Sequence, residues 1–182
     1  MQILRFLALI ALLAVSLLSD DVINKMTPKQ LYVLQTVRDV AKSIPDKNGR
    51  TYENTLSAIC LTESSAGKNI IGDFRKKKSI TKASLGPMQI RIATARHVSQ
   101  NVKKLRWLND LSDAQLAGRL LGDIKLSAKI ATHYLVLLQN NRKDHFYAIS
   151  GYNGGLSNRP YYNRVMKNMD LVNRLLSSGK IS

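Results

Sequence analysis

The sequence predicts an all-α or α-rich α+β domain behind an N-terminal hydrophobic leader. Three observations favour this fold class: apolar residues recur at helical spacings, capping signals precede several of these stretches, and strand signals are weak. The 182 residues suffice for one domain with a sizeable core. We expect that domain to span residues 27–182 and the leader to span residues 1–19.

The leader has the layout of a secretory signal peptide. Met1 and Arg5 precede an apolar run from Phe6 to Leu18, which covers about 20 Å as a helix and is shorter than the roughly 30 Å hydrocarbon core of a bilayer. Cleavage is therefore the first expectation, and Ala14-Val15-Ser16 offers a site. An uncleaved membrane anchor, a leader retained in a larger assembly and a buried helix are the alternatives. A cleaved signal peptide, a membrane anchor and a retained leader all imply that the leader contacts a membrane or an assembly and that the protein is exported.

The helices are expected in order along the chain. Thr27 and Pro28 begin the first one, which ends at Pro45 to Gly49, and Thr51 caps the next. Cys60 lies on the apolar face of this second helix, and as the lone cysteine it is expected to be a buried small hydrophobe. The remaining elements are a small hairpin or irregular loop within Ile70 to Ser84, a helix opened by the Ser112-Gln115 capping box, and helices over Asp123 to Gln139, Asp144 to Ser150 and Tyr161 to Leu176.

The charge balance favours an anionic polymer as partner. Lys and Arg total 28 against 12 Asp and Glu, spread along the chain. The densest cluster, Arg75 to Lys78, has no interleaved aromatic residues that could stack on bases. We therefore expect a solvated loop there, and no specific binding of nucleic acid.

Glu63 is the candidate for acid–base chemistry. It follows Leu56, Ile59 and Cys60 at helical offsets, which put its carboxyl on the apolar face of its helix. Desolvation there would raise its pKa, as a general acid requires. The alternative is a helix-terminal glutamate paired with a lysine or arginine.

Two further motifs carry polar, aromatic and apolar side chains suited to a binding site. In the turn Gly86-Pro87-Met88-Gln89-Ile90, Met88 would form an apolar floor and Gln89 offers amide donors and an acceptor. In the loop Gly151-Tyr152-Asn153-Gly154-Gly155, Tyr152 offers a ring face and a hydroxyl in reach of the acid, and Asn153 can order the loop or bond an acetamido group.

In this order, Glu63-Ser64 and the two motifs resemble the family 1 lytic transglycosylases, the SLT-type, lysozyme-like enzymes that cut peptidoglycan between N-acetylmuramic acid and N-acetylglucosamine. The resemblance covers about Thr51 to Val165, with Pro87 in place of a leucine and glycines in place of both alanines of the loop. It implies a lysozyme-like SLT domain in which Glu63 is the catalytic residue. The substrate-binding residues implied are Ser64, Met88, Gln89, Tyr152, Asn153 and Tyr161, with packing as the alternative role of Tyr161. Thr94 and Tyr134 are assigned to packing.

The family reaction uses one carboxyl group. The acid protonates the glycosidic oxygen and then acts as base towards the muramic acid C6 hydroxyl, which leaves a 1,6-anhydro end. A hydrolase usually needs a second carboxylate, and Asp73 is the only acid between Ser64 and Ile90. A solvent-facing loop position is expected for Asp73. The alternatives to a lytic transglycosylase are a hydrolytic muramidase using Asp73 and a non-catalytic module that binds glycan or another polyanion.

No cofactor and no metal site are expected, because His97, His133 and His145 lack any close pattern of ligand partners. Peptidoglycan glycan strands are the expected partner, in the periplasm or elsewhere in the envelope. Cell-wall remodelling, wall opening for a secretion or conjugation apparatus, and entry by a phage virion protein all agree with the sequence.

Overall fold

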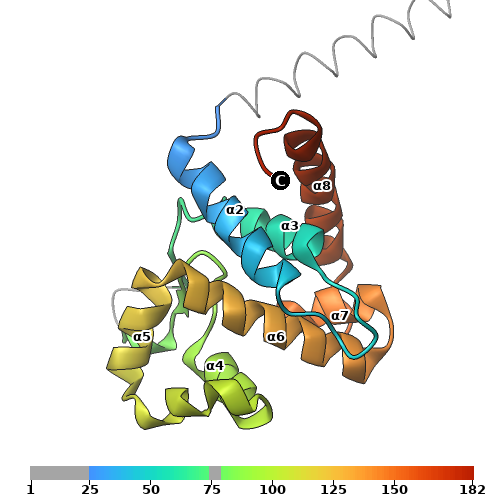
Figure 1. Ribbon diagram of the computed structural model, residues 1–182. Coiled ribbons are helices and arrows are strands. Elements are labelled where there is room, and N and C mark those ends of the chain that lie inside the picture. Colours follow the sequence, from blue (N-terminus) through green and yellow to red (C-terminus); the bar gives the residue numbers. More distant parts are fainter. Residues whose placement is uncertain (1–24, 74–78) are drawn as a thin grey trace, which may run out of the picture.

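The computed structural model describes residues 25–73 and 79–182 as a helical domain with one short pair of strands (Figure 1). The expected α-rich fold class is confirmed. The leader and the basic run Arg75 to Lys78 lie outside the described residues. The elements, with η for a 3-10 helix, are α2 Pro28–Lys42, α3 Glu53–Ser64, β1 Ile71–Gly72, η1 Ile80–Lys82, β2 Ser84–Leu85, α4 Ile92–Asn101, η2 Lys103–Asp110, α5 Asp113–Gly122, α6 Ile124–Arg142, α7 His145–Tyr152 and α8 Arg159–Ser177.

Helix α3 runs through the core and packs against both α2 and α8. Leu56, Ile59 and Cys60 on this helix have no exposed surface, and each fully buried aliphatic side chain contributes roughly 1.5–3 kcal/mol. Burial also raises the pKa of the Cys60 thiol to about 12, and the prediction of a buried cysteine is confirmed. The core helix thereby holds its C-terminal end in a fixed position.

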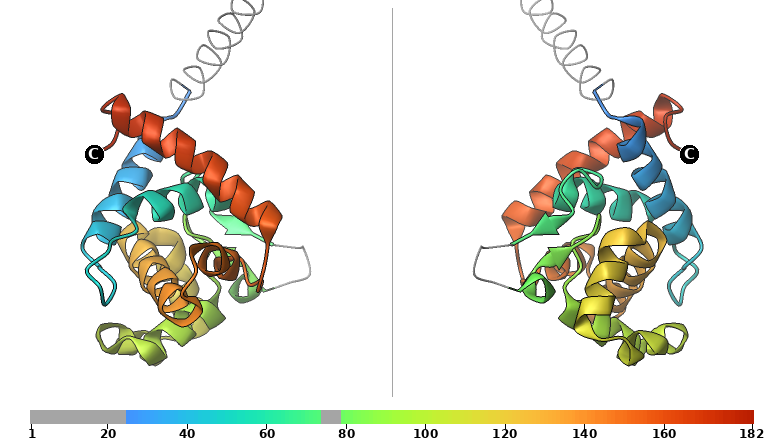
Figure 2. Two further views of the ribbon diagram at one scale, coloured as in Figure 1. Left: turned by 90° about the vertical axis from the view of Figure 1, so that its right-hand side faces the viewer. Right: turned by 90° about the vertical axis from the view of Figure 1, so that its left-hand side faces the viewer.

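Helix α8 crosses the domain and is tied to α2 at its far end. Figure 2 shows its diagonal course, with the two short strands below it in the left-hand view. After α8 the chain turns back, and the backbone oxygen of Ser182 accepts hydrogen bonds from Arg38 Nε at 2.9 Å and Lys42 Nζ at 3.0 Å. The two helices on either side of α3 are therefore joined to each other as well.

Several expected helix starts are confirmed, and two are wrong. The last helix begins at Arg159, two residues before the expected Tyr161, because Asn158 caps it. Thr27 and Ser112 each form a capping box with the glutamine three residues later. Thr51 does not cap α3, because the helix begins one residue later than expected, at Glu53, with Tyr52 at the cap position. The Tyr52 hydroxyl instead donates to Asp46 Oδ2 at 2.7 Å, which closes the preceding loop.

Helices α4 and η2 occupy a stretch for which the sequence pattern suggested no element. In α4, Ile92, Ala95 and Val98 are buried at a spacing of three residues. In η2, Leu105 and Leu108 repeat this spacing, which suits a 3-10 helix with three residues per turn. No helix in the described part of the chain is both long enough and apolar enough to cross a membrane.

The expected small hairpin within Ile70 to Ser84 is confirmed, and it leads into a tight turn. Strands β1 and β2 pair antiparallel, and Gly86 then donates its N–H to the Ile70 carbonyl at 2.8 Å. Gly86 has a φ of 73°, and a Cβ there would lie 2.1 Å from the Leu120 carbonyl oxygen. Only glycine satisfies both conditions, so the position of the turn against α5 depends on it.

Candidate active site

Glu63 lies at the C-terminal end of α3, one residue before the helix ends. Burial raises the pKa of its carboxyl, and the negative charge of Asp73 adds to the rise. A hydrogen bond from Tyr161 and the positive charge of Arg164 oppose it. The net effect extends the pH range in which this carboxyl keeps its proton, which suits a general acid.

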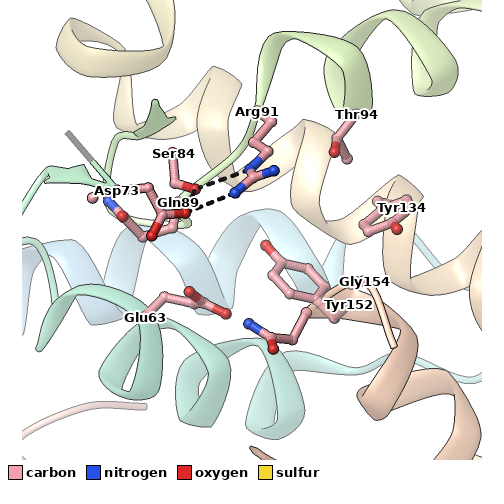
Figure 3. Close-up of a pocket in the computed structure, with 11 residues that line it drawn as sticks. Glu63, Asp73, Ser84, Gln89, Arg91, Thr94, Tyr134, Tyr152 and Gly154 are labelled. Carbon is pink, nitrogen blue, oxygen red and sulfur yellow. Dashed lines mark hydrogen bonds and ion pairs between the residues drawn. The ribbon is translucent and has the colours of Figure 1, made fainter. Parts of the chain in front are cut away.

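The Glu63 side chain opens on a pocket of about 410 Å³ (Figure 3). It is lined by the end of α3, the hairpin with its turn, the start of α4, the middle of α6, and the end of α7 with the loop that follows. A pocket of this size can hold a small ligand or a short stretch of a polymer. Its lining residues are Glu63, Gly72, Asp73, Ser84, Gln89, Arg91, Thr94, Tyr134, Tyr152, Asn153 and Gly154.

Gln89 lines the pocket from the turn, in a left-handed conformation with a φ of 49°. Its side-chain nitrogen donates to the Gly86 carbonyl at 2.9 Å and to the Asn69 carbonyl at 3.3 Å. Both amide hydrogens are therefore used within the protein, contrary to the expectation that they face a sugar. The side-chain oxygen is the Gln89 group that can accept a hydrogen bond from a ligand.

Ser64 and Met88 do not line the pocket, so their predicted role needs correction. Met88 is fully buried and Ser64 is 1% exposed. The Ser64 hydroxyl donates to the Pro87 carbonyl at 2.6 Å and accepts from the Gly67 N–H at 2.7 Å. Ser64 therefore supports the turn from the end of α3, and the Met88 side chain of the turn is packed in the hydrophobic core.

Tyr152 and Asn153 line the pocket from the end of α7, as expected for their loop. The Tyr152 hydroxyl, however, donates to the Met88 carbonyl at 3.0 Å and not to the acid. Asn153 is exposed, and its side-chain oxygen accepts from the Asn158 amide at 3.0 Å. Tyr152 therefore joins α7 to the turn, and Asn153 is held at the pocket edge.

Tyr161 is the tyrosine that reaches the acid. It comes from α8, 98 residues away in sequence, and its hydroxyl donates to Glu63 Oε1 at 2.6 Å. Its side chain is 1% exposed and does not line the pocket. The predicted substrate contact of Tyr161 is therefore corrected to a contact with the acid. Burial and the nearby Glu63 charge raise the pKa of Tyr161, which keeps the hydroxyl a donor.

Tyr134 was expected to pack in the core, but it lines the pocket. It is half-buried on α6, and its hydroxyl donates to the Gly151 carbonyl at 3.2 Å. Its ring lies 5.6 Å from the Tyr152 ring, so the two tyrosines form one aromatic wall. Arg91, Ser84 and Thr94 also line the pocket although no binding role was predicted for them.

Comparison with protein families assigns the chain. The family model described as Transglycosylase SLT domain matches residues 43–170. The chain belongs to the transglycosylase SLT family. The comparison with curated proteins and the comparison with solved structures gave no significant match.

The extent of the SLT match agrees with the geometry. It begins just after α2 and ends within α8, so it contains Glu63, the turn, both wall tyrosines and Tyr161. The resemblance to family 1 lytic transglycosylases and the lysozyme-like SLT fold are thereby confirmed. Helix α2 lies outside the match but packs against α3 and α6.

Asp73 is the second carboxylate at the pocket of this SLT domain. Its side chain is 62% exposed, and Oδ2 lies 2.8 Å from Arg91 Nη2, whose side chain is 60% exposed. Ser84 Oγ also donates to Asp73 at 3.3 Å. The expected solvent exposure is confirmed, and the structure adds that Asp73 faces the pocket and is paired with a cation.

Within residues 25–73 and 79–182, no group of three or more His, Cys, Asp and Glu side chains is arranged to hold a metal ion. His97 packs edge-on against Tyr134 with ring centroids 6.4 Å apart, and His145 stacks on Tyr52 at 6.5 Å. His97 thus has an aromatic packing partner, and His145 has both an aromatic partner and a 2.7 Å hydrogen bond with the Gln139 side chain.

Proposed function

We propose that the protein is a peptidoglycan lytic transglycosylase that cleaves the β-1,4 bond between N-acetylmuramic acid and N-acetylglucosamine, with Glu63 as its only catalytic acid and base. One observation carries the proposal: in an SLT domain, Glu63 is partly buried at the pocket, has a raised pKa and accepts a 2.6 Å hydrogen bond from Tyr161. The second carboxylate at the pocket, Asp73, is paired with Arg91.

The reaction uses the Glu63 carboxyl twice. First Glu63 gives its proton to the glycosidic oxygen as the bond between that oxygen and the muramic acid C1 breaks. The resulting carboxylate then takes the proton of the C6 hydroxyl while the C6 oxygen bonds to C1. The proton returns to Glu63, no water is consumed, and the products are a free N-acetylglucosamine hydroxyl and a 1,6-anhydromuramic acid end.

The surrounding residues support both steps. Tyr161 donates to Oε1 and so fixes the carboxyl orientation in both protonation states. The aromatic wall of Tyr134 and Tyr152 offers ring surface to the sugar, and the Gln89 oxygen can accept from a sugar hydroxyl or amide. Partial burial keeps the carboxyl out of bulk water.

A hydrolytic muramidase is the second candidate, favoured by the position of Asp73 in the same pocket as Glu63. In that reading Asp73 acts as nucleophile or activates a water. The product mass distinguishes the reactions, because anhydro muropeptides are lighter by one water than hydrolytic ones and lack a reducing muramic acid end. We expect mass spectra of digested sacculi to show anhydro products. Reducing, hydrated products would favour the muramidase. A complete absence of products would favour the non-catalytic glycan-binding module.

We also propose that residues 1–19 export the protein to the periplasm or envelope, where residues 27–182 act as the enzyme domain. The apolar run of the leader and the expected wall substrate support this. A role in wall remodelling, with a secretion or conjugation apparatus, or in a phage virion agrees equally with the domain.

Removal of residues 1–19 should leave an active domain, because the first described helix begins only at Pro28. Lysis by the shortened protein and its thermal unfolding transition can be compared with those of the full chain. Loss of the cooperative transition would show instead that the leader is part of the fold.

A further inference from the structure

A second hollow of the domain has no part in the proposed reaction. It has a volume of about 440 Å³ and lies where the end of α2, η2 and α6 meet. We call it the Trp107 hollow. Its lining residues are Ser43, Ile44, Pro45, Lys104, Leu105, Trp107, Leu126, Lys129 and His133.

The ring of Trp107 is presented by its 3-10 helix. Leu105 and Leu108 of η2 are 2% and 0% exposed and fix the helix to the core. Trp107 lies between them in sequence and is 42% exposed, so η2 directs a large aromatic side chain into the hollow. An indole face held in a concave site offers a flat apolar surface to the ring of a sugar.

The charged residues that line the hollow are all basic. Lys104 and Lys129 are exposed, and His133 completes the set on the next turn of α6. The pKa of His133 is lowered, first by burial and then by the positive charges of Lys129 and Lys104. In contrast, the active-site pocket has two carboxylates and one arginine in its lining.

The hollow and the active-site pocket share helix α6. His133 lines the hollow and the next residue, Tyr134, lines the active-site pocket. Consecutive helical residues point about 100° apart around the axis, so the two sites open on adjoining faces of one helix. In Figure 1, α6 runs across the front of the domain between α2 above and α4 below.

We propose that the Trp107 hollow is a second binding site for peptidoglycan, which takes a muropeptide unit outside the cleavage site. Trp107 packs on the sugar ring, and Lys104 and Lys129 pair with the carboxylates of the stem peptide. The polymer class rests on the proposed function. A single ring does not provide the succession of stacking surfaces that single-stranded nucleic acid uses, so the chemistry favours a carboxylate-bearing sugar.

The chain offers a direct probe, because Trp107 is its only tryptophan. The full-length Glu63→Gln variant, which does not cut its ligand, is titrated with a soluble disaccharide muropeptide while tryptophan emission is followed. We expect a saturable change in emission. The double variant Lys104→Gln/Lys129→Gln in the same background should bind on the order of tenfold more weakly, because two exposed charge pairs are lost.

A matched control removes two exposed lysines elsewhere, Lys29→Gln/Lys167→Gln, with the same change in net charge. This variant should bind the muropeptide like the parent. A neutral chitooligosaccharide of equal length should bind more weakly than the muropeptide. No emission change, equal weakening in both double variants, or a stronger response to DNA or to anionic phospholipid vesicles would overturn the proposal.

Sacculus sedimentation gives a second measurement in the same Glu63→Gln background. Trp107→Phe, which keeps an aromatic ring, should retain more bound protein than Trp107→Ala. Equal sedimentation of the two variants would contradict the stacking role. The binding role of the hollow and the proposed function can fail independently. Anhydro products of the unaltered enzyme test the Glu63 chemistry alone.

Discussion

The two carboxylates at the active-site pocket have opposite surroundings. Glu63 ends a core helix, is partly buried and accepts a hydrogen bond from a buried tyrosine. Asp73 follows a two-residue strand, is 62% exposed and is paired with Arg91. Burial raises the pKa of Glu63, whereas Asp73 lies largely in solvent beside a cation. The two carboxylates therefore differ in burial and in the charge of their neighbours.

In the proposed reaction, this difference would allow one carboxyl to suffice. The negative charge of Asp73 is a minor cause of the raised pKa of Glu63. In that reaction Asp73 would support proton donation through its charge alone. In a two-carboxylate hydrolase the second group must instead be able to attack the sugar or activate a water. The following predictions test this contrast.

The largest expected effect is that of Glu63→Gln. The amide keeps the shape of the side chain but cannot donate and recover a proton, so lysis of sacculi should fall about 10²- to 10⁴-fold. Turbidity clearing by the purified protein measures it, with Asp73→Asn as the control that neutralises the other pocket carboxylate. Near-normal lysis by folded Glu63→Gln protein would contradict the assignment.

The same variant also tests the buried carboxyl through stability. Because the pKa of Glu63 in the folded protein is raised above its value of 4.5, the folded state binds the proton more tightly than the unfolded chain does. The stabilisation is present below the unfolded pKa and is lost as the pH rises through the folded pKa. At neutral pH, Glu63→Gln should therefore unfold at the same temperature or higher, and a clearly lower midpoint would show that the ionised carboxylate stabilises the fold.

A smaller effect is expected for Tyr161→Phe, which removes the hydrogen bond to Glu63. A hydrogen bond to a charged group contributes about 1.5–3 kcal/mol, so lysis should fall roughly 10-fold or more through lost orientation. That bond also lowers the pKa of Glu63, so its removal should move the alkaline limb of the pH–rate profile to higher pH. Tyr162→Phe on the same helix is the matched control. An unchanged pH profile for Tyr161→Phe would leave Tyr161 with a packing role only.

Local patterns predicted the frame of the site but not all of its lining. The caps at Thr27 and Ser112 and the apolar-face position of Glu63 depend on residues within a few positions of each other, and the hairpin pairs residues 12 and 14 positions apart. Such short-range signals survive in the folded chain. The start of α3 was misplaced because the loop that precedes it is closed by Tyr52 and Asp46, and no capping side chain marks it.

The roles of the tyrosines could not be predicted, because they depend on contacts distant in sequence. Tyr152 was expected near the acid, but its hydroxyl bonds the turn, and Tyr161 bonds the acid across 98 residues. Tyr134 faces the pocket because α6 is shared between core and cleft. Ser64 follows Glu63 directly, yet points under the turn, since adjacent helical residues face different sides.

The smallest effect is expected for Asp73→Asn, and it tests the contrast most directly. If Asp73 only adds charge near Glu63, the amide should reduce lysis by no more than about threefold, in line with the modest energy of an exposed ion pair. Asp113→Asn is the matched control. Asp113 does not line the pocket, and its Oδ1 forms a comparable ion pair with Arg96 Nη2 at 2.9 Å. The Asp73→Asn variant should also show an alkaline limb at slightly lower pH, since a negative charge that raises the pKa of Glu63 has been removed. An inactive Asp73→Asn protein that folds normally, together with hydrated products from the unaltered enzyme, would show that both carboxylates take part in the chemistry and that the pocket is that of a muramidase.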